Sequence, residues 1–391
     1  MDSIYSIGAI GLKRFLKDKE DEMLLLLESL VNIDSGSTNK KGIDKVSSIL
    51  QKEYEKLGFI VEINNQEVQG NHLVIRHKDA KAPTVMAVAH LDTVFAEGSA
   101  KKRPFTIQEG RAYGPGVIDM KASHVVLLYA LKSLHKKEQV GLENTLILLT
   151  SDEEIGSPTS KELIEKHTVN KKYALIMEPA RQDGSLVTAR RGAGEIALHV
   201  TGKAAHSGIE PQAGSSAIEE LAQKIIKLHQ LTDHEKGISV NVGLIEGGNT
   251  VNTIAPTAVA HVDLRISKIE QGEWLERKVK EICEVPDVEG TTIELIGGIE
   301  RPPMVKNEQT IELLEVIKSV GDELGIEIKD IATGGGSDAS FTSAKGIATI
   351  DGLGPIGGNA HSEEEYLEVA SLVERTELLA RIIQRLTTGQ E

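Results

Sequence analysis

Apolar residues in the first half of the chain follow two spacings in turn. One set recurs three or four residues apart, as on one face of a helix, and consists of Ile43, Val46, Leu50, Tyr54 and Leu57, with Gly58 as a stop signal. Three short runs are instead apolar on both faces, as in buried strands, and lie at Thr84–Ala89, Thr145–Thr150 and Tyr173–Met177. Helical stretches such as Ser123–Leu134 lie between them. This alternation predicts an α/β fold with a central, mostly parallel sheet flanked by helices.

The pattern changes near residue 185. Glu195–Thr201 and Ala258–Ile266 alternate between apolar and polar positions, which is typical of half-buried antiparallel strands. Between them, Ser216 and Glu219 form a capping-box pattern. A helical stripe follows at Ile218, Leu221, Ile225 and Leu228. These elements predict a small inserted α+β domain.

The first pattern returns near residue 300, with the apolar run Ile347–Ile350 and a C-terminal helix from about Leu367 to Leu386. A chain of 391 residues is also long enough for two cores. We therefore predict a discontinuous larger domain at residues 1–186 and 300–391, interrupted by the smaller domain at residues 187–299.

Composition and charge exclude several classes of partner and metal site. The formal net charge is −15 and aromatic residues make up 3% of the chain, so a nucleic-acid partner is not expected. The single cysteine, Cys283, excludes an internal disulfide and a thiolate cluster, so imidazole and carboxylate would have to hold any metal. No stretch approaches the roughly 20 apolar residues that span a bilayer, and no signal peptide is recognised. We therefore expect a cytoplasmic protein with no membrane partner.

Polar clusters follow each of the three buried runs. His90 and Asp92 come after the first, Glu153 and Glu154 after the second, and Glu178 after the third. In open α/β sheets, ligands bind beyond the carboxyl ends of the strands. We therefore expect these side chains to meet at one edge of the sheet, where zinc accepts histidine and carboxylate ligands.

Two further candidates lie in or beside glycine-rich segments. Asp119 belongs to the segment 114–121, where two glycines and a proline permit a tight turn from which a carboxylate can bridge two metals. His361 follows the segment Gly352–Asn359. Each residue taken singly has an ordinary structural interpretation, such as turn chemistry or a solvated face. The joint placement after several strands favours a shared metal site.

Several motifs occur along the chain in a defined order. They are His90-x-Asp92-Thr93-Val94, Gly114-Pro115-Gly116 with Asp119-Met120-Lys121, Asp152-Glu153-Glu154-x-Gly156-Ser157, Glu178-Pro179, Gly202-Lys203-Ala204-Ala205-His206-Ser207, Gly248-Asn249-x-x-Asn252-x-x-x-Pro256, Asp263-Leu264-Arg265, Gly334-Gly335-Gly336-Ser337-Asp338-Ala339 and His361-Ser362. Together they resemble the co-catalytic zinc metallopeptidase family of glutamate carboxypeptidase, peptidase T, succinyl-diaminopimelate desuccinylase, acetylornithine deacetylase and aminoacylase. The resemblance spans nearly the whole chain and is strongest to the glutamate carboxypeptidase branch.

The resemblance implies two Zn²⁺ per subunit. His90, Asp119 and Glu178 would hold one ion. Asp119, Glu154 and His361 would hold the other. Some family members carry aspartate at the position of Glu178, and either carboxylate coordinates zinc. Co²⁺ or Mn²⁺ also fits this ligand set.

The resemblance also implies catalytic roles. Asp92 would hydrogen-bond the far nitrogen of His90 and fix its tautomer. Glu153 would be the general base that takes a proton from the attacking water and passes it to the leaving amine. Residues about 187–299 would form a ferredoxin-like lid that makes a homodimer. His206 would then reach the partner's active site and stabilise the developing oxyanion.

Substrate selection is predicted to depend on a carboxylate-binding group. Arg265 lies on the polar side of an alternating strand, and a guanidinium suits bidentate capture of a carboxylate. A surface salt bridge with Asp263 is the competing interpretation. Asn252 and the backbone amides of Gly335 and Gly336 would add hydrogen bonds. This group predicts a small peptide or N-acyl amino acid substrate with a free α-carboxylate.

Three functions remain open at this point. The first is a carboxypeptidase that releases a C-terminal amino acid, with glutamate as the candidate taken from the nearest branch. The second is a di- or tripeptidase of the peptidase T type, or an N-acyl amino acid deacylase. The third is an inactive, metal-binding dimeric scaffold, which would require loss of Glu153 or of a zinc ligand. The sequence retains Glu153 and all the predicted zinc ligands.

Overall fold

The computed structural model describes residues 11–136 and 141–388, which divide into two compact units. Unit 1 contains Met1–Thr188, Lys306–Ala332 and Ser337–Glu391, and unit 2 contains Ala189–Val305 and Thr333–Gly336. The predicted inserted domain ended at residue 299 and lacked the glycine segment. Unit 2 takes in that segment because Arg191 N donates to Thr333 O, and Arg190 donates to Gly335 O.

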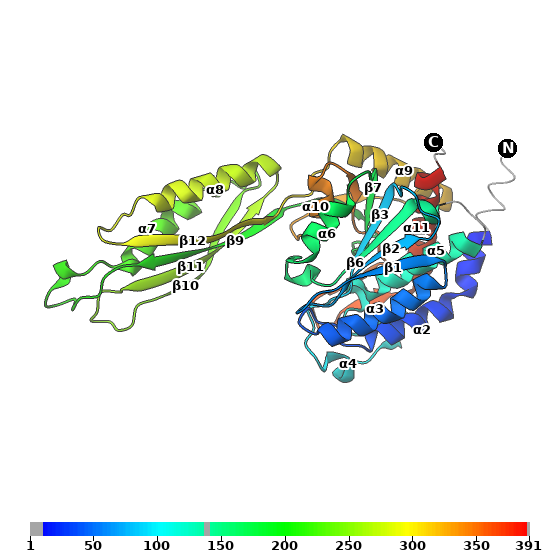
Figure 1. Cartoon of the computed structure of the whole chain (residues 1–391), viewed down its shortest axis with the longest axis horizontal. Helices are drawn as coiled ribbons and strands as arrows, with labels where there is room; N and C mark the ends of the chain where they lie inside the picture. Colours follow the sequence, from blue (N-terminus) through cyan, green and yellow to red (C-terminus); the bar gives the residue numbers. More distant parts are fainter. Residues whose placement is uncertain (1–10, 137–140, 389–391) are drawn as a thin grey trace. The chain divides into compact units, whose positions relative to one another are not determined.

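A six-stranded mixed sheet forms the centre of unit 1 (Figure 1). In spatial order its strands are β1 (Phe59–Asn64), β2 (His72–His77), β6 (Thr145–Thr150), β3 (Val85–His90), β7 (Tyr173–Ile176) and β14 (Ala348–Ile350). The last four run parallel, whereas β1 and β2 are antiparallel to their neighbours. The predicted α/β fold is therefore confirmed. The β1–β2 edge was not predicted, because β1 is only partly buried and its apolar pattern is weak.

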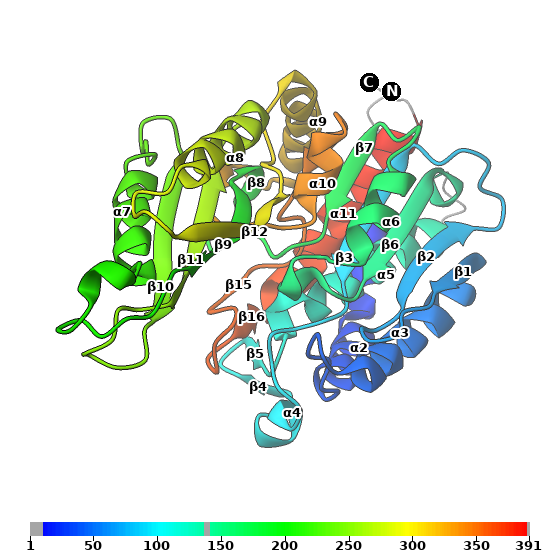
Figure 2. The same cartoon turned by 60° about the vertical axis from the view of Figure 1, so that its left-hand side comes forward.

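Helices cover both faces of this sheet. The helices described in unit 1 are α2 (Glu20–Val31), α3 (Lys40–Glu55), α4 (Ser99–Lys102), α5 (Ala122–Lys136), α6 (Ser160–His167), α9 (Glu308–Leu324), α10 (Ala339–Ala344) and α11 (Val369–Thr388). Helix α5 packs along α11, whereas α6 and α10 pack together on the opposite face (Figure 2). Strands β3 and β6 are buried along their whole length as a result.

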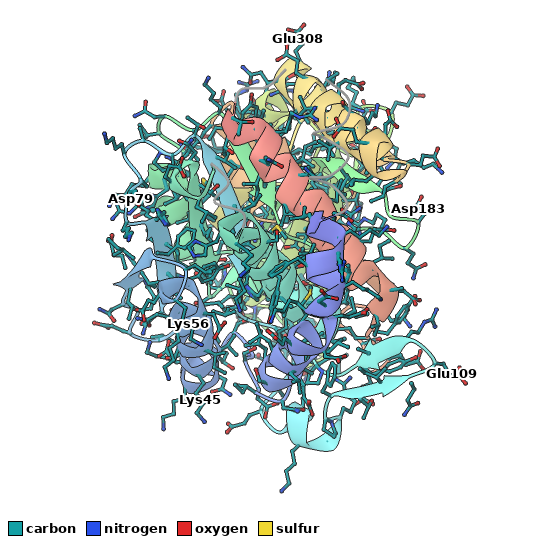
Figure 3. All side chains as sticks on the ribbon, turned by 90° about the vertical axis from the view of Figure 1, so that its right-hand side faces the viewer. Lys45, Lys56, Asp79, Glu109, Asp183 and Glu308 are labelled. Atoms are coloured by element: carbon teal, nitrogen blue, oxygen red, sulfur yellow. The ribbon has the colours of Figure 1, made fainter. Side chains whose placement is uncertain are left out.

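The predicted helical stripe on α3 forms part of the core, since Ile43, Val46, Leu50 and Tyr54 are fully buried. Charged side chains such as Lys45, Lys56, Asp79 and Glu109 project from the outside of unit 1, where water solvates them (Figure 3). None of the helices among the described residues combines the length and apolar character needed to cross a membrane.

Smaller elements connect the loops of unit 1. A second sheet has the order β15 (Gly357–Gly358), β16 (Tyr366–Glu368), β5 (Arg111–Tyr113) and β4 (Thr106–Gln108). The pair β8 (Leu186–Arg190) and β13 (Asp330–Thr333) forms a further ladder. Short helical turns are η1 (Val117–Lys121), η2 (Leu142–Asn144) and η3 (Glu153–Ile155). Pairing of β16 with β5 brings the segment after His361 beside the segment that leads to Asp119.

Unit 2 has the chain order of a ferredoxin-like fold. Its elements are β9 (Gly192–Thr201), η4 (Pro211–Ala213), α7 (Ala217–His229), β10 (Ser239–Gly247), β11 (Thr257–Ile266), α8 (Ile269–Glu284) and β12 (Thr292–Arg301). The strands form one antiparallel sheet in the order β10-β11-β9-β12. Alternate residues of β11 are buried against the helices, as the sequence predicted for an α+β domain.

The predicted buried face of α7 needs a correction. Ser216 caps the helix as expected, because its side chain accepts from Glu219 N. Ile218, however, is exposed, and the buried positions include Glu220 and Lys224. The helix is rotated in this way because the loop at residues 285–291 supplies polar partners for both buried charges.

Candidate metal centre

The carboxyl ends of neighbouring parallel strands carry most of the candidate ligands. His90 is the last residue of β3 and lies in register with Thr150, the last residue of β6. Glu153 and Glu154 follow β6 in η3, and Glu178 lies just beyond the end of β7. The hydrogen-bonded register of these strands therefore brings the polar clusters to one edge of the sheet, as the sequence predicted.

Asp119 lies between the two candidate imidazoles. Its Oδ1 is 3.0 Å from His90 Nε2, and its Oδ2 is 3.2 Å from His361 Nε2. Asp119 interrupts the helical turn η1 with a φ of −113° and a ψ of 91°, and the nearby Gly116 adopts a φ of 71°, where a side chain would be strained. Because its two oxygens face two different rings, this carboxylate has the arrangement of a bridging ligand.

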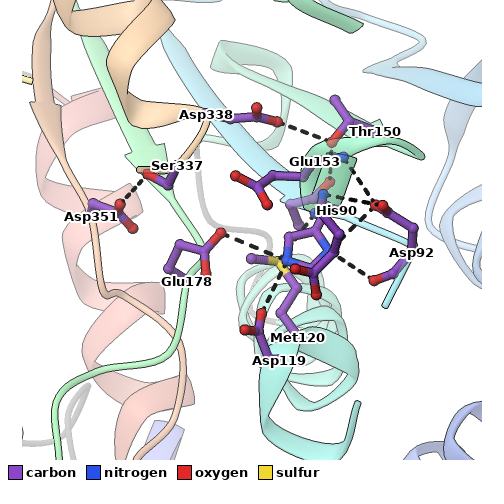
Figure 4. A network of polar contacts seen from close by, with 12 residues as sticks. His90, Asp92, Asp119, Met120, Thr150, Glu153, Glu178, Ser337, Asp338 and Asp351 are labelled. Carbon is purple, nitrogen blue, oxygen red and sulfur yellow. Dashed lines mark hydrogen bonds and ion pairs between the residues drawn. The ribbon is translucent and has the colours of Figure 1, made fainter. Parts of the chain in front are cut away.

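The remaining candidates lie close to these imidazoles, and Figure 4 shows Glu153 and Glu178 near His90 and Asp119. Glu154 Oε2 is 3.2 Å from His361 Nε2, and Glu178 Oε1 is 3.7 Å from His90 Nε2. Ligand atoms of His90, Glu153 and Glu178 all lie within 4.8 Å of one another. The structure thus brings together the five predicted metal ligands and the predicted base.

Hydrogen bonds and repulsion shift the pKa values within this cluster. Burial lowers the pKa of His90, but hydrogen bonding to Asp119 and Asp92 raises it well above its ordinary value. Hydrogen bonds to Asp119 and Glu154 raise the pKa of His361 to about 10. Burial would raise the pKa of Asp119, yet its bonds to both rings lower it.

The pKa values of the other two carboxylates move upward. Burial raises the pKa of Glu154, against the effect of its bond to His361. Burial, together with repulsion from Asp119, raises the pKa of Glu178 well above its ordinary value. Both carboxyls therefore lie where negative charge is not fully balanced.

The residues present fit a pair of divalent cations. Four carboxylates, those of Asp119, Glu153, Glu154 and Glu178, converge on only two imidazoles. The Oε1 atom of Glu154 is buried and has no hydrogen-bond partner among the described residues. Two divalent cations would balance this charge and occupy such an atom, and carboxylate with imidazole is a ligand set that zinc accepts.

The contact predicted between Asp92 and His90 differs in detail. His90 Nδ1 lies 2.9 Å from the backbone oxygen of Asp92 and 3.5 Å from its carboxylate. That carboxylate is held by Ser37 Oγ at 2.8 Å and by the amides of Glu153 and Glu154 at 3.2 Å each. The backbone oxygen of Asp92 accepts the hydrogen bond from His90 Nδ1, because the Asp92 side chain turns toward these other donors. Asp92 therefore positions both the ring and the Glu153–Glu154 loop.

Asp338 belongs to the segment Gly334–Ala339, and the sequence alone predicts no role for it. Its carboxylate accepts from Thr150 Oγ1 at 3.1 Å (Figure 4) and from Ser157 Oγ at 2.5 Å. These hydroxyls flank the loop that carries Glu153, so Asp338 holds that loop at both ends. The serine–aspartate pair after the glycine segment was its only sequence signal.

Glu365 was missed entirely. Its buried carboxylate accepts from the backbone amides of Gly116, Ile118 and Asp119 at 3.0, 2.9 and 3.0 Å. Burial raises the pKa of Glu365 to about 7, against the lowering effect of these amides. It is the last of three consecutive glutamates, a pattern typical of a solvated surface, so the sequence does not distinguish it from its neighbours.

The other predicted functional residues lie in unit 2. His206 and Asn252 belong to adjacent segments, because Ser207 N donates to Asn252 O at 3.0 Å, and both side chains are exposed. Arg265 forms the competing salt bridge, with its Nη2 2.9 Å from Asp263 Oδ1.

Gly335 and Gly336 also belong to unit 2. Their carbonyl oxygens accept from Arg190 at 3.0 and 3.3 Å, which orients this glycine segment. The structure therefore places the substrate-binding candidates in one unit and the candidate metal ligands in the other.

Comparisons with known proteins identify the family of the chain and structures that share its fold. The model of the family described as Peptidase family M20/M25/M40 matches residues 86–385. Carboxypeptidase G2 of Pseudomonas sp. (strain RS-16) is 29% identical over 381 residues, which cover 95% of this chain and 91% of that protein.

Two solved structures share the fold. Aminopeptidase PepT from Bacillus cereus ATCC 10987 has a TM-score of 0.78 at 22% identity, covering 94% of this chain and 98% of that one. The Bacillus subtilis YXEP protein, a dinuclear metal binding peptidase, has a TM-score of 0.67 at 14% identity, covering 95% and 99%.

Proposed function

The chain belongs to peptidase family M20/M25/M40 and is a metallopeptidase, and on that premise we propose that it is an exopeptidase. Its substrate would be a small peptide or N-acyl amino acid, cut at the amide bond next to a free α-carboxylate. The observation that carries this proposal is the placement of Asp119, whose two oxygens face His90 and His361.

The proposed metal ligands follow from that placement. His90, Asp119 and Glu178 would hold one cation, and Asp119, Glu154 and His361 would hold the other. Zinc is the proposed metal, with Co²⁺ or Mn²⁺ as substitutes, because the ligands are imidazole and carboxylate. When bound, such a pair supplies Lewis acidity, which polarises a carbonyl and lowers the pKa of a bound water toward about 7.

The chain's own residues would do the proton transfer. Glu153 follows directly on β6, and its carboxylate lies among the candidate ligands His90 and Glu178. It would accept a proton from the attacking water and deliver it to the leaving amine, since one carboxylate can perform both steps in sequence. Asp92 fixes the backbone of the base through the amide of Glu153, at 3.2 Å.

Recognition of the substrate carboxylate is proposed for unit 2. Arg265 offers a guanidinium that already holds the carboxylate of Asp263, which is the same chemistry that a substrate α-carboxylate would use. Asn252 and the amides of Gly335 and Gly336 would add hydrogen bonds. Glutamate as the released amino acid is proposed from the resemblance of the sequence motifs to the glutamate carboxypeptidase branch.

A homodimer through unit 2 is part of the proposal. Strand β10 forms an edge of its sheet and carries Leu244 and Ile245, which are 67% and 63% exposed. An exposed apolar edge strand is suited to pairing with a second copy. His206, exposed in the same unit, would then serve the partner's site as the oxyanion donor. A cytoplasmic location is also proposed, in keeping with a single cysteine.

The test is a screen of the zinc-loaded protein against N-blocked peptides, N-acyl amino acids and free tripeptides. We expect cleavage of N-blocked substrates with a free α-carboxylate and none of the corresponding amides. Glu153→Gln keeps the side-chain volume but removes the proton acceptor. It should retain the metals and lose turnover by at least about 10²–10⁴-fold. Turnover that survives this substitution would exclude Glu153 as the base.

A peptidase T-like tripeptidase is the second candidate, favoured by the shared fold with the aminopeptidase PepT. It would cleave free tripeptides faster than N-blocked ones, so the same screen separates the two functions. An inactive scaffold is the third candidate, and it would show no turnover of any substrate after full metal loading.

A further inference from the structure

Glu365 makes an unusual set of contacts for a glutamate in an acidic run. It is fully buried, while the preceding Glu363 and Glu364 are exposed. Its Oε1 accepts from the amides of Ile118 and Asp119 at 2.9 and 3.0 Å, and its Oε2 accepts from Gly116 N at 3.0 Å. One carboxylate therefore binds three amides within four residues of backbone.

These amides need an acceptor from outside the segment. Asp119 and Met120 depart from helical dihedral angles, so a regular ladder of helical hydrogen bonds does not form across η1. Buried backbone N–H groups without a partner cost free energy, and a carboxylate is a strong acceptor for several of them at once. Among the described residues, the carboxylate of Glu365 is the acceptor for the amide of Asp119.

A second buried charge holds the same segment from its other side. Lys121 Nζ donates to Pro115 O at 3.2 Å and to Ile33 O at 2.8 Å. The amides of Gly116, Ile118 and Asp119 thus point to an anion, while the carbonyl of Pro115 points to a cation. The position of the Asp119 backbone is determined by these two groups, and its carboxylate depends on that position.

Glu365 also links Asp119 to His361. Glu365 and His361 lie on two successive turns of the chain. In the first, Ser362 N donates to Asn359 O, and in the second, Glu365 N donates to Ser362 O. His361 adopts a left-handed φ of 64° in the first of these turns. The carboxylate of Glu365 therefore ties the turn that presents one imidazole to the loop that presents the shared carboxylate.

We infer that Glu365 is a positioning residue of the metal centre, which holds the Asp119 carboxylate where both cations can share it. This inference rests on the proposed function, because it assumes that Asp119 bridges two cations. Glu365 itself would not touch metal or substrate. Its effect would pass through the amides of Gly116, Ile118 and Asp119.

The test compares the full-length wild type with Glu365→Gln, Glu365→Asp and the exposed control Glu364→Gln. Co²⁺ is the probe, because its visible absorption bands report the number and geometry of its ligands. Its affinity is measured by competition with a chromophoric chelator, and the spectrum is recorded at saturation. Far-UV circular dichroism of each metal-free variant reports the fold.

Glu365→Gln retains an acceptor oxygen but turns an NH₂ group toward one of the amides. We expect it to weaken Co²⁺ binding by about 10- to 100-fold and to change the saturated spectrum. Glu364→Gln should match the wild type in both measurements. A folded Glu365→Gln protein with wild-type affinity and spectrum overturns the positioning role, even if its thermal stability falls.

If Glu365→Gln does not fold, Glu365→Asp decides the question. It keeps the negative charge but withdraws the carboxylate by one methylene group. An altered spectrum supports the inference, and a wild-type spectrum and affinity overturn it. Failure of the proposed function looks different, because the wild-type protein itself would then bind no Co²⁺.

Discussion

Two clusters of charged side chains, one in each unit, differ in how their charges are balanced. In unit 2, Lys224 Nζ lies 3.1 Å from Glu220 Oε1, 2.8 Å from Asp287 Oδ2 and 2.6 Å from Val285 O. Glu220 Oε2 accepts from Val288 N at 2.6 Å. Lys227 also pairs with Asp287, so two cations face two anions.

The cluster in unit 1 lacks such a balance. Four carboxylates meet two imidazoles, and Glu154 Oε1 has no hydrogen-bond partner among the residues described. Glu220 Oε1 also lacks a hydrogen bond, but it lies 3.1 Å from the ammonium nitrogen of Lys224. Both clusters contain buried charged groups, such as Glu220 in unit 2 and His90 in unit 1, so burial alone does not distinguish them. A cluster whose charges are paired serves the fold, whereas a cluster with excess negative charge has room for a cation that completes it.

The largest expected effect tests the unsatisfied cluster directly. Asp119→Asn removes the only candidate for a shared ligand among the described groups and should lower kcat/KM by about 10⁴-fold, or roughly 5.4 kcal/mol. Steady-state kinetics on the best substrate of the screen measures it. The surface substitution Asp79→Asn should leave kcat/KM unchanged. An Asp119→Asn enzyme within tenfold of the wild type would show that Asp119 does not serve both sites.

The balanced cluster should instead affect stability. Lys224→Met leaves Glu220 buried beside apolar surface and should cost about 3–5 kcal/mol of unfolding free energy. The single tryptophan, Trp274, packs against the core of unit 2, so its fluorescence in urea follows this unit. Lys227 is 42% exposed, and Lys227→Met should cost at most about 1 kcal/mol. An equal loss of unfolding free energy in Lys224→Met and Lys227→Met would contradict the expectation that the buried lysine contributes more.

Metal uptake should stabilise only the protein whose unit 1 cluster is intact. At free metal 100-fold above Kd, the expected gain is about 2.7 kcal/mol, measured by urea unfolding with far-UV circular dichroism. Lys224→Met should show the same gain as the wild type, because the two clusters share no side chains. A gain that disappears in Lys224→Met would mean that the clusters are coupled.

The pH dependence of metal binding should be the smallest effect. His361 has a pKa of about 10, because Asp119 and Glu154 hydrogen-bond to its ring, so it carries a proton at neutral pH. A cation must displace that proton, and affinity should therefore rise with pH until about pH 10 and fall as pH is lowered. Each displaced proton contributes about tenfold, or roughly 1.4 kcal/mol, per pH unit, and His90, whose pKa is also raised, adds to the slope of His361.

Co²⁺ affinities at pH 6.5, 7.5 and 8.5 measure this slope, with values obtained by chelator competition. His361→Ala should have a shallower slope, whereas the exposed His229→Gln in unit 2 should keep the wild-type slope. A flat profile in the wild type would contradict a protonated His361 in the metal-free protein.

Much of unit 1 was predictable because buried strands are continuous apolar runs. The run Thr145–Thr150 coincides with β6, and the polar residues after each run reach one edge because parallel strands end together. The same reasoning could not identify Glu365 or the buried Glu220, since their partners are backbone amides and loops far away in the sequence. A glutamate that caps such amides has the same local sequence as a glutamate in water.

Local sequence patterns are enough to predict the two fold classes, the strands that lead to His90, Glu154 and Glu178, and the residue types that suit a pair of cations. Those features depend on local periodicity and on the chemistry of single side chains. The folded chain is needed to show which oxygen of Asp119 faces which imidazole, which charges are balanced, and which of three adjacent glutamates is buried. These depend on distances between segments that are far apart in the sequence, and no local pattern encodes such distances.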